Sequence, residues 1–207
     1  MRYFFILFLI VSIAFINCKN NDSRSVDFRS ISPLNSDSTI NMIVEIPTGT
    51  TAKYEMDKTT YTLLMDSING KPRYIDYLGY PANYGMIPNT ILSKDEGGDG
   101  DPLDILLLGP AVKRGSVEKV KVIGVLELLD NGEQDDKLIA INPATNWSKV
   151  EKIEDLDKFY PGTKTIIASF FENYKGKRKV QLTGWSGKSR AIEILNKSIP
   201  LNKRSAN

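Results

Sequence analysis

From Met42 onward the sequence divides into short apolar or alternating runs, and this pattern limits the fold more than any other feature. Gly, Pro and Asn separate the runs, for example at Asn69-Gly70, Gly109-Pro110 and Asn131-Gly132. Runs of this length, bounded by turn residues, are typical of strands in a small barrel or sandwich. The expected strands are Met42–Ile46, Lys53–Met56, Thr60–Met65, Leu103–Leu108, Val117–Leu129, Lys137–Ile141 and Val180–Leu182.

Helical periodicity is found only near the C-terminus. Pro161 can open a helix, because proline suits the first helical turn. The apolar stripe of this helix would consist of Ile166, Ile167, Phe170, Phe171 and Tyr174. A second helix is expected over Ser189–Ile199, where apolar residues recur at helical spacing. The predicted fold class is therefore mainly β, of the α+β kind: a β-barrel with two C-terminal helices packed outside it.

Three carboxylates, those of Asp99, Asp101 and Asp104, stand directly before the apolar run 105–108. Clustering three like charges there would be unfavourable without a cation, and carboxylate oxygens suit Mg²⁺, Mn²⁺ or Ca²⁺. The alternative is a simple acidic turn, because Asp and Gly are common turn residues. An EF-hand calcium loop is excluded, because it needs Gly at its sixth position and Glu at its twelfth, where this chain has Asp104 and Pro110.

Charged residues interrupt the core pattern of several other runs: Glu45, Lys53, Glu55, Asp130, Asp135 and Lys137. Lys53 and Glu55 alternate on one expected strand and so share a face. Asp130 ends one strand and Asp135 precedes the next, so pairing of the two strands brings these carboxylates together. A second carboxylate set can therefore face the first, although each residue alone could be a solvated strand-end charge.

Composition excludes several classes of function. The 207 residues include no histidine, which excludes His general bases, His-containing triads and His-ligated zinc. The net charge of +2 gives no reason to expect a nucleic-acid partner. Cys18 is the only cysteine, so no disulfide can form within the chain. The length and the 41% hydrophobic content suit one globular domain with a sizeable core.

The N-terminus resembles a secretory signal over residues 1–17, with Arg2 before an apolar run that ends at Ile16. The run has about 13 apolar residues, fewer than the roughly 20 needed to span a membrane. Cys18 follows directly, as the lipidated cysteine does in bacterial lipoproteins, although Asn17 departs from the usual small residue. Uncleaved insertion and ordinary secretion are the alternatives. Residues 18–39, rich in Asn, Ser and Asp, are expected to form a flexible tether, and residues 40–207 the folded domain.

Between about Ile40 and Trp185 the sequence resembles the soluble family I inorganic pyrophosphatases. The matching blocks are Val44-Glu-Ile-Pro47, Lys53-Tyr-Glu55, Gly79-Tyr-Pro-Ala-Asn-Tyr-Gly85, Gly98-Asp-Gly-Asp-Pro-Leu-Asp104, Ile123-Gly-Val-Leu126, Asp130 with Asp135 and Lys137, and Phe170-Phe-Glu-Asn-Tyr-Lys175. The resemblance implies a five-stranded OB-like barrel with two helices, and hydrolysis of pyrophosphate to two phosphates. It also implies several Mg²⁺ ions per site, with Mn²⁺ as a substitute, and a homo-oligomer.

The resemblance also assigns a role to each matching residue. Metal ligands would be Glu45, Asp99, Asp104, Asp130 and Asp135. Asp101 would be the general base that accepts a proton from the attacking water. Pyrophosphate would be bound by Lys53, Arg73, Tyr84, Lys137, Tyr174 and Lys175. Glu55 and Tyr80 would hold secondary positions in the pocket, and Tyr80 could equally be a core aromatic.

Two other functions would fit a barrel of this kind. One is binding of single-stranded nucleic acid, which needs a basic groove with stacking aromatics and conflicts with the carboxylate cluster. The other is an inactive adhesion or structural lipoprotein, which conflicts with the chemically competent residues at every matched position. The sequence therefore favours an exported pyrophosphatase, held on a membrane through lipidated Cys18, over the cytoplasmic location usual for the family.

Overall fold

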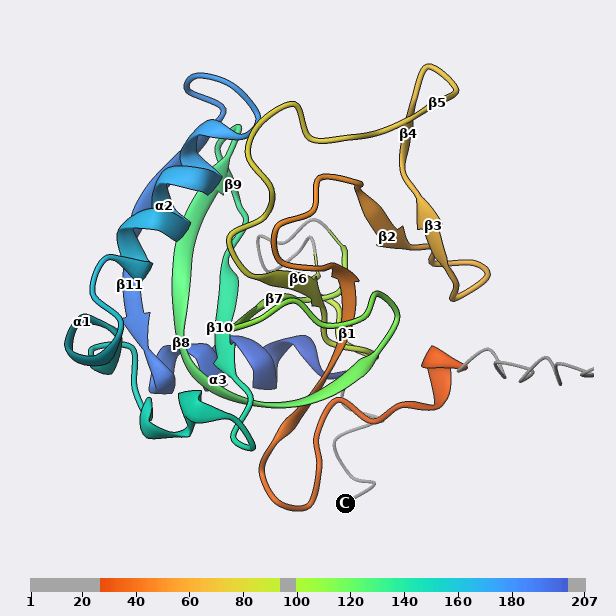
Figure 1. The fold of residues 1–207 in the computed structure, drawn as a ribbon. Coiled ribbons are helices and arrows are strands. Elements are labelled where there is room, and N and C mark those ends of the chain that lie inside the picture. Colours follow the sequence, from red (N-terminus) through yellow and green to blue (C-terminus); the bar gives the residue numbers. More distant parts are fainter. Residues whose placement is uncertain (1–26, 94–99, 201–207) are drawn as a thin grey trace, which may run out of the picture.

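In the computed structural model, residues 27–93 and 100–200 are described, and they form a barrel with helices on its outside (Figure 1). The main strands are β1 (Ile40–Ile46), β6 (Asn83–Met86), β7 (Asp104–Leu108), β8 (Val117–Asp130) and β10 (Lys137–Ile141). Their hydrogen-bonded order is β1-β6-β7-β10-β8, and β8 pairs again with β1. The path thus returns to its first strand, which confirms the five-stranded OB-like arrangement.

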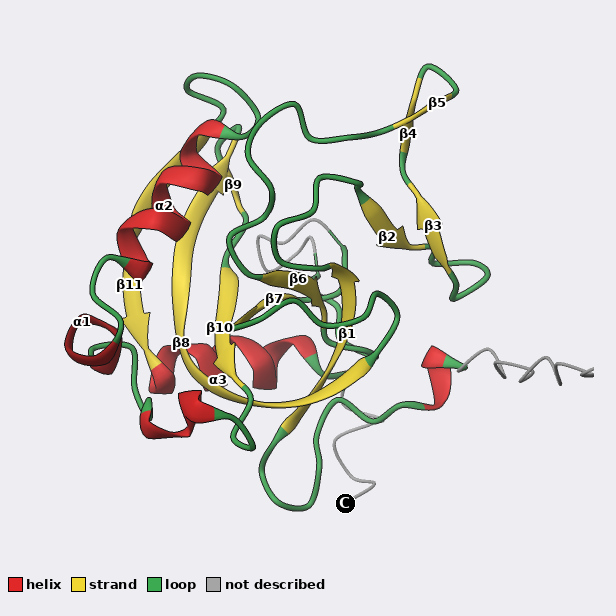
Figure 2. Ribbon diagram, in the orientation of Figure 1, coloured by secondary structure: helices red, strands yellow, loops and turns green. Residues whose placement is uncertain are grey.

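Two further strands extend the sheet beside β8. These are β9 (Glu133–Gln134) and β11 (Val180–Gly187), and both pair antiparallel with β8. Strand β11 runs beyond the expected Val180–Leu182 because its last residues pair with β8 as far as Gly124. The long strand β8 is therefore shared by the barrel and by this extension (Figure 2).

The core lies on both faces of the strands. Along β7 and β10 consecutive residues are buried, so these strands read as continuous apolar runs and not as alternating ones. Leu106 and Ile139 belong to one cluster, which includes residues of α2, whereas Ile105 and Leu138 belong to a second, which includes residues of α3. The two faces therefore bind different helices.

The described part of the chain has three α-helices: α1 (Asp155–Phe159), α2 (Thr163–Asn173) and α3 (Lys188–Ser198). The second and third were expected, and α1 was not. Helix α2 lies over β11 and buries Ile167, Phe170 and Phe171, while α3 lies across β8 (Figure 1). Ile166, expected in the apolar stripe of α2, is instead 62% exposed. The stripe is narrower than predicted, since Ile166 lies on the outer side of the helix.

Four short strands make two hairpins that stand away from the barrel (Figure 2). They are β2 (Tyr54–Met56) with β3 (Leu63–Met65), and β4 (Ser67–Ile68) with β5 (Lys71–Pro72). The turn between β4 and β5 is Asn69-Gly70, both with positive φ, as a tight hairpin turn requires. The first hairpin is shorter than the expected Lys53–Met56 and Thr60–Met65, because Asp57 accepts hydrogen bonds from Thr59 and Thr60 and holds a turn there.

The segment before β1 differs from the expected tether in its described part, residues 27–39. A 3₁₀ helix, η1 (Phe28–Ser30), buries Phe28 against Ile43 and Met86. The Asn89 side-chain amide donates to the carbonyls of Arg29 and Ile31. Residues 27–39 are mostly polar, but the buried Phe28 side chain and these hydrogen bonds attach them to the barrel. The rest of the expected tether and the expected signal lie outside the described residues. Residues 201–207 at the other end of the expected domain lie outside them as well.

A 3₁₀ helix, η3 (Asn146–Lys149), follows β10. Strand β6 was not expected from the sequence, because its residues Asn83–Met86 are not an apolar run. Here Gly85 is packed directly against β1: a Cβ built on it would lie 2.0 Å from the Ile43 carbonyl oxygen. Glycine is thus required for the β1–β6 pairing.

We predict that Gly85→Ala destabilises the protein by about 2–3 kcal/mol or more, because backbone atoms of β1 would have to move. Gly187→Ala is the control, since a Cβ there meets nothing within 4 Å. It should change the free energy of unfolding by about 1 kcal/mol or less, since its expected cost is only that of alanine at the N-cap of α3. Urea unfolding of both variants measures the difference, and equal stability would contradict the close approach.

Candidate active site

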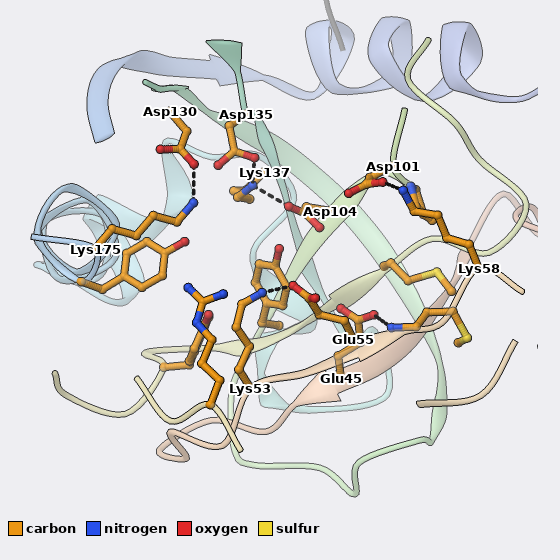
Figure 3. A pocket seen from close by; sticks show the side chains of 17 residues that line it. Glu45, Lys53, Glu55, Lys58, Asp101, Asp104, Asp130, Asp135, Lys137 and Lys175 are labelled. Carbon is orange, nitrogen blue, oxygen red and sulfur yellow. Dashed lines mark hydrogen bonds and ion pairs between the residues drawn. The ribbon is translucent and has the colours of Figure 1, made fainter. Parts of the chain in front are cut away.

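One cavity of about 260 Å³ at the edge of the barrel gathers the expected site residues (Figure 3). Every expected site residue that the structure describes lines it: Glu45, Lys53, Glu55, Arg73, Tyr80, Tyr84, Asp101, Asp104, Asp130, Asp135, Lys137, Tyr174 and Lys175. Asp99 and Cys18 lie outside the described residues. Met56, Lys58, Met86 and Pro102 complete the lining and were not expected.

Strand direction explains why these residues meet. Asp104 is the first residue of β7 and Lys137 the first of β10, and the two strands are parallel, so both residues lie at the same edge. Strand β8 runs antiparallel to β10, so its last residue, Asp130, reaches that edge as well. Glu45 comes from the neighbouring β1 and Lys175 from the chain just after α2. The topology therefore collects charges that are far apart in the sequence.

Five of the six acidic groups described in this pocket pair with a lysine, and Glu45 instead accepts a hydrogen bond from the Met56 N–H. The Lys137 ammonium, 2% exposed, donates to both Asp104 and Asp135. Lys175 pairs with Asp130, Lys58 with Asp101, and Lys53 with Glu55, as the dashed lines in Figure 3 show. Lys58 was missed by sequence reasoning, because a lysine in a turn gives no sign that it will reach another loop.

The pocket thus holds opposite charges in nearly equal number. The cationic side chains are Lys53, Lys58, Arg73, Lys137 and Lys175, and the acidic ones are Glu45, Glu55, Asp101, Asp104, Asp130 and Asp135. Cations that line a pocket can bind the oxygens of an anion, and carboxylates can bind metal ions. An anion that arrives together with divalent cations fits both sets at once.

Burial changes the acid–base behaviour of several groups. Desolvation, with a smaller contribution from Asp104, raises the pKa of Glu45 to about 8. Burial alone would lower the pKa of Lys137, but Asp104 and Asp135 outweigh it and the pKa is raised. Desolvation, reinforced by the charge of Arg73, lowers the pKa of Lys53. Glu45 is therefore largely protonated at neutral pH, while Lys137 stays charged.

Asp66 supports two of the expected pyrophosphate ligands without lining the pocket. Its carboxylate accepts a hydrogen bond from Arg73 Nη1 at 2.8 Å and lies 3.8 Å from Lys53 Nζ. Its main-chain N–H donates to the Lys53 carbonyl, and its carbonyl accepts from the Arg73 N–H. Asp66 therefore fixes both cations at the base of the β4–β5 hairpin. Nothing in the sequence pattern pointed to this role except an acidic residue between two basic ones.

Aromatic side chains form the wall behind the cations. Tyr80, 2% exposed, packs against Tyr84, Phe170, Phe171 and Tyr174. Burial raises the pKa of Tyr80, Tyr84 and Tyr174, so all three hydroxyls stay protonated and can donate hydrogen bonds. Tyr80 is thus both a core residue and part of the lining, as its two sequence interpretations allowed.

The donor set has the chemistry of a site for a hard cation, because it offers carboxylate oxygens and no sulfur or imidazole. In the structure lysine ammoniums stand at Asp104, Asp130 and Asp135, which shows that these carboxylates accept positive charge. Among residues 27–93 and 100–200, no three acidic groups converge closely enough to hold an ion by themselves. The residue types therefore fit a divalent metal, and the ligand assignments stay predictions.

An OB-like barrel whose edge combines carboxylates, cations and tyrosines defines a class of protein: a hydrolase for a small, highly charged phosphate compound. The comparisons with known proteins agree. Residues 42–203 match the family model described as inorganic pyrophosphatase. The chain belongs to this family, the soluble family I inorganic pyrophosphatases, which confirms the resemblance found in the sequence.

Individual relatives cover most of the chain. The inorganic pyrophosphatase of Gluconobacter oxydans is 36% identical over 171 residues, which are 79% of this chain and 91% of that protein. The Helicobacter pylori pyrophosphatase structure has a TM-score of 0.67 at 33% identity and covers 82% of this chain and 96% of its own. A Trypanosoma cruzi vacuolar soluble pyrophosphatase, solved in complex with PPi, has a TM-score of 0.74 at 32% identity. The match covers 77% of this chain and 67% of that chain.

We predict that Glu45→Gln stabilises the metal-free protein, and more so as the pH rises. Between pH 4.5 and about 8 the unfolded chain carries an ionised Glu45 while the folded chain keeps it protonated, so wild-type stability falls through this range. Glutamine keeps the acceptor for the Met56 N–H, 2.9 Å away, and has no charge to bury. The gain should grow by up to about 1.4 kcal/mol per pH unit. Thermal unfolding in EDTA at several pH values tests this, and a pH-independent effect would contradict it.

Proposed function

We propose that this pocket hydrolyses inorganic pyrophosphate to two phosphates and that it works with several Mg²⁺ ions, for which Mn²⁺ can substitute. The observation that carries the proposal is that six carboxylates and five cationic side chains line one cavity in a chain of the pyrophosphatase family. Pyrophosphate carries three to four negative charges near neutral pH, so its binding needs both protein cations and metal ions. A pocket lined only by cationic or only by acidic side chains would not bind both pyrophosphate and its metal ions.

The metal ions would be held by Asp99, Asp104, Asp130 and Asp135, with Glu45 contributing through water. This assignment is supported by the oxygen-only donor set and by the lysines that neutralise the described carboxylates. When bound, Mg²⁺ supplies positive charge for the phosphoryl oxygens and makes water more acidic.

The side chains of the protein would bind and orient the substrate. Lys53 and Arg73, both held by Asp66, would contact one phosphoryl group, and Lys175 the other. Lys137 would lie near the leaving phosphate, whose negative charge it can offset because it stays protonated. The hydroxyls of Tyr84 and Tyr174 would donate hydrogen bonds to phosphoryl oxygens. Glu55 and Tyr80 would support Lys53 and the tyrosine wall.

Asp101 would take the proton of the attacking water. It lies at the rim of the same cavity, about half exposed, and its partner Lys58 is also exposed. A solvent-accessible carboxylate can accept a proton and release it to bulk water within each turnover. The water would attack one phosphorus in line with the bond that breaks, and phosphate would leave.

Two variants separate these roles. Wild-type protein should release phosphate from pyrophosphate in Mg²⁺ and lose this activity in excess EDTA. Asp101→Asn should lower kcat by about 10²–10⁴-fold and leave the Mg²⁺ requirement unchanged, because the carboxamide cannot accept a proton. Asp104→Asn should instead raise the Mg²⁺ concentration needed for half-maximal activity. Full wild-type turnover in EDTA would refute the mechanism, and equal behaviour of the two variants would refute the division of roles.

We also propose that the protein is an exported lipoprotein whose mature chain begins at lipidated Cys18. The support is the apolar run that ends at Ile16, two residues before the only cysteine, and the polar segment that follows. In the described part of the chain no helix is long and apolar enough to cross a membrane. Location in the cytoplasm is the alternative, and a homo-oligomeric state is expected from the family resemblance.

Cys18→Ser should block acylation and processing but leave the hydrolysis rate of the folded domain unchanged. Each buried methylene of an acyl chain contributes about 0.8 kcal/mol, so a multiply acylated wild type should remain in the membrane fraction. Cell fractionation and mass spectrometry of the N-terminus measure this. A soluble cytoplasmic wild type that retains Met1 and carries no lipid on Cys18 would refute the proposal.

A further inference from the structure

Asp136 is a buried carboxylate that the proposed mechanism does not use. It stands between two pocket residues, Asp135 and Lys137, and is 7% exposed. Alternate side chains of an extended segment point to opposite faces. Asp135 and Lys137 line the cavity, whereas Asp136 points away from it into the protein. A buried carboxylate is unfavourable unless its oxygens are hydrogen-bonded, so Asp136 must have donors within the protein.

Both oxygens of Asp136 are hydrogen-bonded. Oδ1 accepts from the main-chain N–H of Leu128 at 3.1 Å, and Oδ2 accepts from Nε2 of Gln134 at 2.6 Å. Leu128 lies in β8 and is fully buried. Its N–H has no access to water and depends on an acceptor within the protein.

The first of these bonds replaces a rung of the sheet. Strand β9 pairs Gln134 with Leu129, and β10 pairs Lys137 with Leu126, so the register is continuous and Leu128 lies opposite Asp135. In a regular antiparallel ladder such a pair exchanges two main-chain hydrogen bonds. Here the Asp135 N–H donates to the Leu128 carbonyl at 2.9 Å, but the Leu128 N–H donates to the side chain of Asp136. The Asp136 carboxylate therefore stands in for the Asp135 carbonyl.

The hydrogen bond from Leu128 to the Asp136 side chain joins β8 to residues 135–136, which link β9 to β10. That link carries Asp135, and β10 begins with Lys137 directly after Asp136. The Lys137 ammonium is shared between Asp135 and Asp104, so a shift of the link would move two charged groups of the pocket together. Groups of this kind must be held within a fraction of an ångström for catalysis.

We propose that Asp136 is a positioning residue: its carboxylate completes the β8 ladder and so aims Asp135 and Lys137 into the catalytic pocket. The proposal rests on the proposed function of that pocket. Its basis is the acceptor that Asp136 provides for the Leu128 N–H, and not its charge. A side chain that offers the same acceptor should therefore replace it.

The test compares Asp136→Ala with Asp136→Asn in the full chain. Asparagine keeps an oxygen for Leu128, and Gln134 can rotate its amide to accept from the asparagine. Alanine leaves the Leu128 N–H without that acceptor. We expect Asp136→Ala to lower kcat by about 10–100-fold and to raise the Mg²⁺ concentration for half-maximal activity, which is the size of loss typical of residues that support a metal site from outside it. Asp136→Asn should stay within about threefold of wild type.

A control separates positioning from loss of stability. Ile194→Val removes one buried methylene in α3, on the face that packs against β8, and should lower the melting temperature while leaving the kinetics of the folded protein unchanged. All rates are measured well below the melting temperature and are scaled to folded protein. If Asp136→Ala does not fold, Asp136→Val, which fills the buried space and favours a strand, takes its place with the same expected losses.

The outcomes are distinct. Loss of activity in Asp136→Ala with recovery in Asp136→Asn supports the proposal. The proposal would be overturned if Asp136→Ala had the same kinetics as Ile194→Val. It would also be overturned if Asp136→Asn were as impaired as Asp136→Ala, because the charge of Asp136 and not its hydrogen-bond acceptor would then matter. Absence of pyrophosphate hydrolysis in the wild type would instead refute the proposed function.

Discussion

The buried ammonium of Lys137 is the interaction on which the site depends. A lysine that is 2% exposed is stable as a cation only if carboxylates compensate it, and Asp104 and Asp135 do so from two different segments. This contact joins the starts of the parallel strands β7 and β10 at one edge of the barrel. Loss of either carboxylate would leave a buried charge only partly compensated. The fold and the arrangement of the pocket are thus maintained by the same ion pairs.

The pocket is neutralised by its own side chains. Lys175 and Lys137 hold the carboxylates that are expected to bind metal, and Asp66 and Glu55 hold the cations that are expected to bind phosphate. Substrate and metal ions together bring charges of both signs, so they can exchange partners with these pairs at little electrostatic cost. An anion or a cation that entered alone would separate these ion pairs and replace only one partner of each. The arrangement accounts for a site that would bind its substrate as a metal complex.

Sequence reasoning predicted the strands with continuous apolar runs well, because β7, β10 and the middle of β8 are buried on both faces. It missed β6, whose residues include Asn83 and Gly85 and resemble a turn, although Gly85 is what allows β1 to approach. It assigned Ile166 to a buried stripe because hydrophobicity alone does not show where the partner of a helix ends. It read residues 27–39 as a tether because a few anchors such as Phe28 are outnumbered by polar neighbours.

For the site, the sequence by itself determined which chemical groups are available: carboxylates, lysines, an arginine and tyrosines, with no histidine and one cysteine. It also placed Asp104, Asp130, Asp135 and Lys137 at or beside the ends of strands. Only the tertiary structure decided which groups meet, because strand order and direction set which ends share an edge. The roles of Lys58, Asp66 and Asp136 arise at that level. Each depends on a contact across the fold, and pairing in space leaves no mark in the local pattern of a single sequence.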